Sequence, residues 1–256
     1  MMGFRVLLFK ELREQLRTGR LVAVAAVFVL FGILSPLTDR YMKELLDTLG
    51  SESGGMQFTV PAPSLAGDLS QVIKNISQFG VVCALLLGMG AVAWEKERGT
   101  AGMIMTKPAS RAAFLAAKLV AISLNLALAV ALGCGLAYLY TALLYPDLFP
   151  VVGYLVMSLV MWWTLVVFVA ITLLGSTLTR SAIAAAGIAF VAFLVLGLLV
   201  TVPVIGAWSP LALLGPASDL ALGTASASFV GPLLFNLALV PILFGITWAS
   251  FRRQEL

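Results

Sequence analysis

The sequence predicts an all-α polytopic membrane protein with six transmembrane helices, and composition is the first reason. Of its 256 residues, 61% are hydrophobic and 11% are charged, and the mean hydropathy is +1.05. A soluble domain carries about 25% charged residues, so the lipid bilayer is the solvent that suits this chain. The other two reasons are the length of the apolar runs and the uneven distribution of lysine and arginine between them.

Six apolar runs approach or exceed the roughly 20 residues that a membrane helix needs. They cover residues 21–37, 76–94, 112–144, 151–178, 182–202 and 229–251. We expect helices because lipid cannot satisfy the backbone of an open strand, and barrel strands would alternate in polarity. The run 112–144 is longer than a bilayer requires, so its start is expected in water. The run 21–37 is short, which leaves open an extension past Pro36.

Lysine and arginine predict the orientation. Only Arg40, Lys43 and Lys74 lie after odd-numbered runs; the other thirteen of the sixteen precede the first run or lie around the ends of the even-numbered runs. Because positive residues stay on the cytoplasmic side, both termini are predicted to be cytoplasmic, in a multi-pass protein of the inner (plasma) membrane. The pI of about 9.3 then reflects charge at the inner leaflet and not nucleic-acid binding.

Four segments outside the runs complete what we expect to be one membrane domain, 1–256. Segment 1–20 is amphipathic and predicts an interfacial helix that Gly19 ends, either an anchor on anionic lipid or a docking surface for a cytoplasmic partner. Its apolar face is expected to hold Phe4, Leu7, Leu8, Leu12 and Leu16, and its polar face Lys10, Glu11, Arg13, Glu14 and Arg17.

The other segments are 38–75, 95–111 and 203–228. The first predicts an outer loop with a short helix that Gly50 ends, and a second helix that Ser64 caps; it either connects spans or gates a path. Segment 203–228 predicts short re-entrant helices in the outer leaflet, one beginning at Ser209-Pro210 and ended after about one turn by Gly215.

Catalytic chemistry is not indicated. The apolar runs contain no Asp, Glu or His, the whole chain has no His, and Cys83 and Cys134 lie inside runs. Catalytic and metal sites are therefore not expected, and a proton- or sodium-coupled carrier or a channel is disfavoured. A G-x-x-x-x-G-K-[ST] phosphate loop is also absent, so this chain is not expected to be an enzyme that hydrolyses ATP.

Segment 95–111 is the most informative stretch. Thr100 is expected to cap a short helix that Lys107-Pro108 ends, and Ser110 to cap the next run. An apolar patch around Met103 is rimmed by charges of both signs. From the residues alone, the segment is either a plain connector or a docking element for a soluble partner.

The order of these pieces resembles the ABC type-2 permease family, the membrane subunits of ABC exporters. The residues that carry the resemblance are KELR at 10–13 and Glu95, Glu97, Gly99, Thr100, Pro108, Ser110, Arg111 and Lys118. The resemblance implies that 95–111 holds a coupling helix that fits a cleft on an ATP-binding subunit, and that the N-terminal helix is an interfacial elbow. It also implies a similarity of 209–223 to the family's re-entrant helices.

The resemblance therefore implies a permease subunit of an ATP-driven exporter. The implied partners are an ABC ATPase subunit, which would bind ATP and Mg, a second permease copy or paralogue, and membrane lipid. The implied ATPase-coupling residues are Glu95, Glu97, Arg98, Gly99, Thr100, Met103, Lys107, Pro108 and Arg111, with Lys10, Glu11, Arg13 and Arg17 on the interfacial helix. One alternative stays open, a non-transporting subunit that transmits force to, or anchors, an extracytoplasmic partner.

Overall fold

The computed structural model describes residues 2–52, 63–99, 110–146, 148–202, 204–224 and 230–254, with the backbone alone for 2 and 43–52. Within these ranges the chain is helical and contains no strand. The elements, in chain order, are α1 (Met2–Arg17), α2 (Arg20–Glu52), α3 (Leu65–Glu97), α5 (Arg111–Leu144), α6 (Val151–Leu178), α7 (Ala182–Leu199), the 3-10 helices η1 (Gly206–Trp208) and η2 (Pro210–Leu213), α8 (Leu214–Ala221) and α9 (Val230–Arg252).

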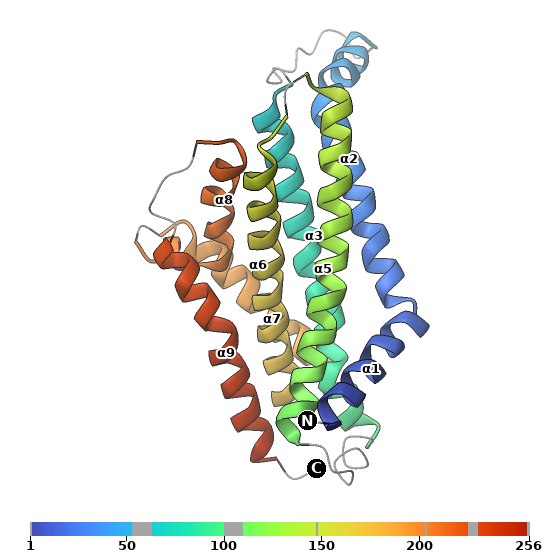
Figure 1. Ribbon diagram of the computed structural model, residues 1–256, viewed down its shortest axis with the longest axis vertical. Helices are drawn as coiled ribbons and strands as arrows, with labels where there is room; N and C mark the ends of the chain where they lie inside the picture. Colours follow the sequence, from blue (N-terminus) through green and yellow to red (C-terminus); the bar gives the residue numbers. More distant parts are fainter. Residues whose placement is uncertain are drawn as a thin grey trace.

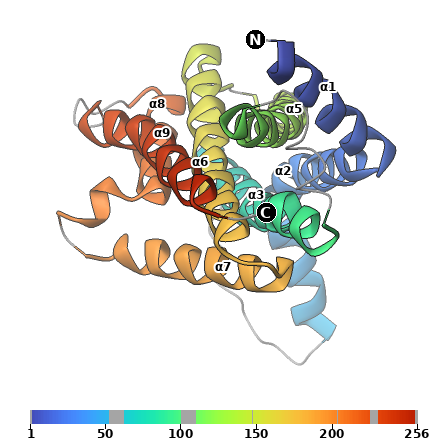
Figure 2. The same ribbon diagram turned by 90° about the horizontal axis from the view of Figure 1, so that it is seen from below.

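Six of the described helices are long and apolar enough to cross a membrane: α2, α3, α5, α6, α7 and α9. Most of them run along one long axis, whereas α7 is steeply tilted across it, and both termini lie at the same end of the bundle (Figures 1 and 2). We call this the terminal end and the opposite one the far end. The predicted all-α membrane fold with six spanning helices is therefore confirmed.

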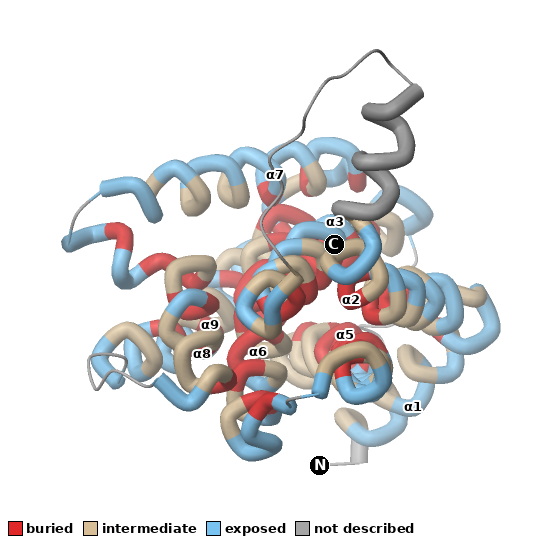
Figure 3. The backbone as a smooth tube through the Cα atoms, turned by 90° about the horizontal axis from the view of Figure 1, so that it is seen from above, coloured by how far each residue is buried: buried red, intermediate tan, exposed pale blue. Residues whose placement is uncertain are grey.

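Helices α3 and α6 form the centre of the bundle. Within the most apolar stretch of each helix, 67% of α3 and 61% of α6 is buried, against 17% of both α7 and α9. Viewed from the far end, the buried positions gather around α3 and α6, whereas α7 is largely exposed along its length (Figure 3). The apolar surface of α7 and α9 is thus left for lipid or for another protein chain.

Glycine allows α2 and α5 to touch through their backbones. A Cβ atom at Gly32 would lie 2.3 Å from the carbonyl oxygen of Gly133, and one at Gly133 would lie 2.9 Å from that of Phe28. Small residues permit such contacts between membrane helices, where close packing replaces the hydrophobic effect as the source of association. The α2–α5 pair shares the largest interhelical contact in the bundle.

Two predicted helix ends are wrong. Helix α2 continues through Pro36 and Gly50 to Glu52, so the short separate helix expected in 38–75 belongs to the first span. Next to the proline, the Ser35 hydroxyl donates to the carbonyl of Phe31, one turn earlier, at 2.6 Å. Helix α8 likewise runs through Gly215, because Pro216 lies in the first turn, where its missing N–H is not needed.

The predicted N-caps at Ser64 and Ser110 are confirmed. The Ser64 hydroxyl accepts a hydrogen bond from the Gly67 amide at 3.0 Å, and that of Ser110 accepts one from the Ala113 amide at 3.1 Å. Gly19, with a φ of +70°, follows the end of α1 and reverses the chain into α2. Helix α1 then lies at the edge of the bundle against α5 and α2, as the view from the terminal end shows (Figure 2).

Candidate functional site

The face that α1 turns to the bundle is partly polar. Gln15 is buried, and its amide oxygen accepts a hydrogen bond from Asn125 Nδ2 of α5 at 2.7 Å. Glu11, expected on the polar face of this helix, accepts from Lys118 Nζ of α5 at 3.0 Å. Part of the polar face therefore meets the bundle, which helical spacing alone does not reveal. The exposed side of α1 carries Val6, Phe9, Arg13, Leu16 and Arg17.

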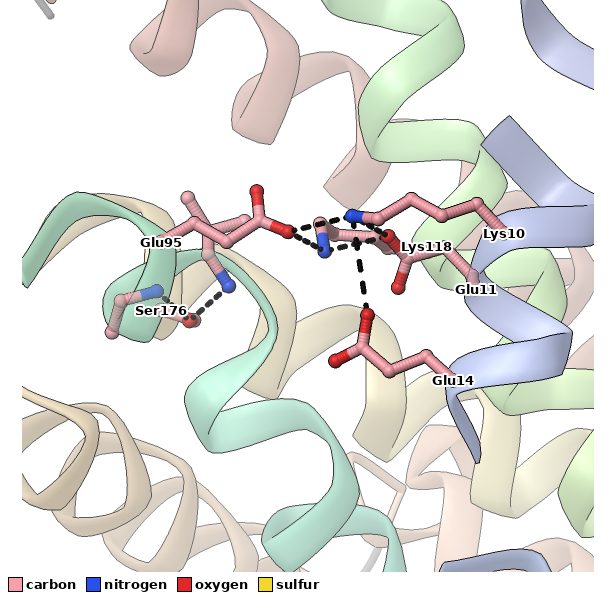
Figure 4. A network of polar contacts seen from close by, with 8 residues as sticks. Lys10, Glu11, Glu14, Glu95, Lys118 and Ser176 are labelled. Atoms are coloured by element: carbon pink, nitrogen blue, oxygen red, sulfur yellow. Dashed lines mark hydrogen bonds and ion pairs between the residues drawn. The ribbon is translucent and has the colours of Figure 1, made fainter. Parts of the chain in front are cut away.

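Five charged side chains join α1, α3 and α5 at the terminal end. We call them the lysine–glutamate cluster: Lys10, Glu11, Glu14, Glu95 and Lys118. Lys118 Nζ lies 2.8 Å from Glu95 Oε1, and Lys10 Nζ lies 3.4 Å from the same oxygen. Lys10 Nζ also lies 3.3 Å from Glu11 Oε1 and 3.9 Å from Glu14 Oε2. Figure 4 shows the side chains converging from the three helices.

Burial makes Lys118 the critical member of this cluster. Its side chain is only 4% exposed, and those of Glu11 and Glu95 are 12% and 15% exposed. An ammonium group so removed from water is stable only with close carboxylate partners. Lys10 is more exposed; burial lowers its pKa, but Glu11, Glu95 and Glu14 together raise it above the ordinary lysine value. Lys10 therefore remains charged at neutral pH.

A second set of contacts fastens the end of α3 to the end of α6. The Ser176 hydroxyl accepts hydrogen bonds from the backbone amides of Val92 and Ala93 at 3.0 and 2.9 Å. It also donates to the carbonyl of Met89 at 2.8 Å. Lys96 Nζ donates to the carbonyl of Thr177, one of the last carbonyls of α6. A cation suits this position because the carbonyl end of a helix carries partial negative charge.

Arg111, the first residue of α5, fastens α9. Its Nη1 donates to the carbonyl oxygens of Phe251, Arg252 and Gln254 at 2.9, 2.7 and 3.2 Å. The Gln254 side chain in turn donates to the carbonyl of Thr177 at 2.8 Å. The ends of α6 and α9 are thus tied to the two residues, Lys96 and Arg111, that flank segment 98–110.

The residues that the sequence singled out for coupling fall into three groups. Glu95 and Arg111 make contacts inside the chain, as just described. Glu97, Arg98 and Gly99 are exposed at the terminal end. Thr100, Met103, Lys107 and Pro108 lie outside the described residues. Of the predicted coupling residues that the structure describes, Glu97 and Arg98 are the exposed charged ones, which a partner could reach directly.

The far end holds a carboxylate pair that the sequence reasoning missed. Asp68 is fully buried in the first turn of α3 and accepts a hydrogen bond from the Thr141 hydroxyl of α5. Asp39 of α2 accepts from the Ser64 amide at 3.2 Å and from the Tyr145 hydroxyl at 2.6 Å. The expectation of acid-free spans failed because α3 begins at Leu65 and not near Ile76. The signal was present, since an acid four residues after a serine cap belongs in a first helical turn.

The described chain is thus a six-helix membrane bundle in which the ends of α3 and α5 are fastened to their neighbours, and the sequence comparisons give its class. Residues 5–256 match the family described as ABC-2 family transporter protein, and the chain belongs to that family. It is 30% identical over 254 residues to the uncharacterized transmembrane protein YxlG of Bacillus subtilis (strain 168), covering 97% of each chain.

A second relative is the probable ABC transporter permease protein NosY of Stutzerimonas stutzeri. The two chains are 30% identical over 186 residues, which is 70% of this chain and 61% of NosY. The family and these relatives support the assignment of this chain as a membrane subunit of the ABC transporter class.

Proposed function

We propose that the chain is the permease subunit of an ATP-driven exporter, and that a separate ABC ATPase docks at its terminal end. The observation that carries the proposal is the anchoring of both flanks of segment 98–110. On one side, Glu95 and Lys96 connect α3 with α1, α5 and α6; on the other, Arg111 connects α5 with α9. A displacement of this loop would therefore move five helix ends together.

Within this proposal the terminal end is cytoplasmic, as the distribution of lysine and arginine predicts. Glu97 and Arg98 would contact the ATPase, and Glu95 and Arg111 would pass its movement into the bundle. ATP must favour one arrangement of the permease over another, because a ligand shifts a conformational equilibrium only by its differential affinity. A second copy of the chain, or a paralogue, would complete the path through the apolar surfaces that α7 and α9 leave open.

The spans favour an apolar or amphipathic substrate. Hydrogen bonds within the chain engage several polar side chains inside the bundle: Trp162 Nε1 donates to the Ser123 carbonyl at 2.9 Å, and Asn236 Nδ2 to the Trp208 carbonyl at 3.1 Å. Such groups hold helices together and present little to a polar solute.

Transport by the purified complex tests this proposal against the alternative of a force-transmitting or anchoring subunit. The chain and its ATPase would be reconstituted in vesicles with fluorescent amphiphiles of several headgroup charges, and their movement followed with and without ATP. An exporter moves at least one amphiphile across the bilayer only when ATP is present. ATP hydrolysis that responds to the permease without movement of any amphiphile would contradict export and favour the alternative.

A further inference from the structure

A cavity of about 410 Å³ lies between α1, α3 and α5 at the terminal end, beside the first residue of α2. Its apolar part is formed by Leu87, Gly90, Ala91 and Ile122. The rest of its lining is charged or polar, namely Lys10, Glu11, Glu14, Gln15, Arg20, Trp94, Glu95, Arg98 and Lys118. The cavity is therefore amphipathic, with an apolar part and a charged part.

The charges of this lining are only partly satisfied within the chain. The three glutamates are engaged with Lys10 and Lys118 in the lysine–glutamate cluster. Arg20 and Arg98 have no carboxylate partner among the residues that the structure describes. The guanidinium of Arg20 lies 5.1 Å from the centre of the Trp94 ring, which orients it without neutralising it. Four cations against three carboxylates leave the lining with a net positive charge.

Gln15 adds an uncharged donor. It is only 5% exposed, and its amide oxygen is taken by Asn125. Its amide nitrogen has no hydrogen-bond partner in the described part of the chain, although Gln15 lines the cavity. The nitrogen is not sealed inside the chain, so it is available to a ligand with acceptor oxygens in the cavity. Arginine favours phosphate in particular, because its planar guanidinium donates to two oxygens at once.

The position of the cavity distinguishes a lipid from a soluble phosphate. Arg20 opens the first candidate span, and Trp94 lies in the last turn of α3, so both are at the edge of the membrane. Trp94 lies flat against α3: a Cβ atom at Gly90 would be 2.2 Å from one of its ring carbons. Tryptophan and arginine at this depth are typical of the headgroup region, where anionic lipid attracts cations.

We propose that this cavity binds the phosphate headgroup of an anionic phospholipid, with Arg20, Arg98 and Gln15 donating to the phosphate and the apolar part contacting the start of the acyl chains. The ligand would fill the junction between α1 and α3 without breaking the lysine–glutamate cluster. The cavity would be a single, saturable lipid site, distinct from the diffuse attraction of basic residues to a membrane. It does not depend on whether the chain transports a substrate.

Native mass spectrometry of the delipidated, detergent-purified chain tests the proposal. Phosphatidylglycerol would be titrated into wild type, Arg20→Gln and Arg20→Lys. The matched control is Arg17→Gln, because Arg17 is an exposed cation of α1 that does not line this cavity. We expect one saturable phosphatidylglycerol per chain, about tenfold weaker binding in Arg20→Gln, and binding within about twofold of wild type in the control. Partial recovery in Arg20→Lys would show that charge at this position is what matters.

Several results would overturn the assignment. Equal losses in Arg20→Gln and Arg17→Gln would reduce it to diffuse surface attraction. Equal or tighter binding of phosphatidylcholine would remove the preference for an anion. Displacement of the lipid by inorganic phosphate or glycerol 3-phosphate at matching concentration would assign the site to a soluble phosphate. A second variant, Gln15→Leu, tests the site independently if Arg20→Gln does not fold. Unchanged phosphatidylglycerol binding in a folded Gln15→Leu protein would contradict the role given to the Gln15 amide.

Discussion

Lys118 shows how a single residue depends on groups far away in the sequence. Its partners, Glu95 and Glu11, lie 23 and 107 positions away, on two other helices. The sequence marked Lys118 by family resemblance, and placed it near the end of a span where it was free to reach water. Neither its burial nor its pairing with Glu11 was predictable, since a pair across helices depends on how α1 docks.

Removing the Lys118 cation should be costly. In Lys118→Met, Glu11 and Glu95 lose their closest partner, and a broken buried ion pair typically costs about 3–5 kcal/mol. We expect the melting temperature in detergent to fall by roughly 10 °C. The double variant Lys118→Met/Glu95→Gln should lose less than the sum of the single variants, because both variants break the same Lys118–Glu95 ion pair.

Lys10→Met is the matched control for that cycle. The Lys10 side chain is 44% exposed, so its ion pairs are screened by water and worth less than about 1 kcal/mol. Because its pKa is raised in the folded state, whatever it contributes is present at neutral pH and is lost only as the pH rises past the ordinary lysine pKa. A Lys118→Met protein that melts like the Lys10→Met protein would show that the buried pairs are not a structural joint.

At the scale of elements, the sequence predicted the spans well and the connections less well. Long apolar runs leave little choice of structure in lipid, and the serine caps marked where α3 and α5 begin. Gly50 and Gly215 were misleading as helix ends, because glycine is only a weak helix breaker. The attachment of α9 through Arg111 was also out of reach, since it depends on carbonyl groups that every helix end exposes.

Arg111 should control the stability of the last turn of α9. Arg111→Gln removes a cation from three carbonyl groups, an interaction worth roughly 1 kcal/mol at a helix terminus. We expect amide hydrogen exchange in the last turn of α9 to become about fivefold faster. Arg180→Gln is the control, because Arg180 is an exposed cation that follows α6 at the same end. Equal rates of amide hydrogen exchange in the two variants would contradict the role of Arg111 in fastening α9.

For the whole molecule, the proposed orientation rests on the distribution of charge. The chain presents Arg98 at the terminal end and Arg40 toward the far end, both exposed, while Cys83 and Cys134 are buried. Single cysteine replacements at the two arginines can be labelled in intact cells with a membrane-impermeant maleimide. Position 40 should react from outside, and position 98 only after lysis. The reverse pattern would invert the topology and place the proposed docking surface on the wrong side.

The proposed permease function requires a separate ATPase at the terminal end. The sequence and the family resemblance predict a docking segment, and the structure separates its flanks into the exposed Glu97 and Arg98 and the inward-turned Glu95 and Arg111. The two groups should behave differently when they are changed. Reversal of the exposed charges should abolish docking of the ATPase. Glu95→Gln should leave docking intact and impair ATP-driven transport.

The most direct measurement is affinity purification of the intact chain from its own cells in mild detergent, with quantification of the accompanying proteins. We predict a stoichiometric ABC ATPase with the wild type, with Glu95→Gln and with Arg40→Glu, the matched charge reversal toward the far end. We predict its loss, by at least about tenfold, with Glu97→Lys/Arg98→Glu. A wild-type chain that purifies without an ATPase in several detergents, or a Glu97→Lys/Arg98→Glu chain that retains it fully, would contradict the account.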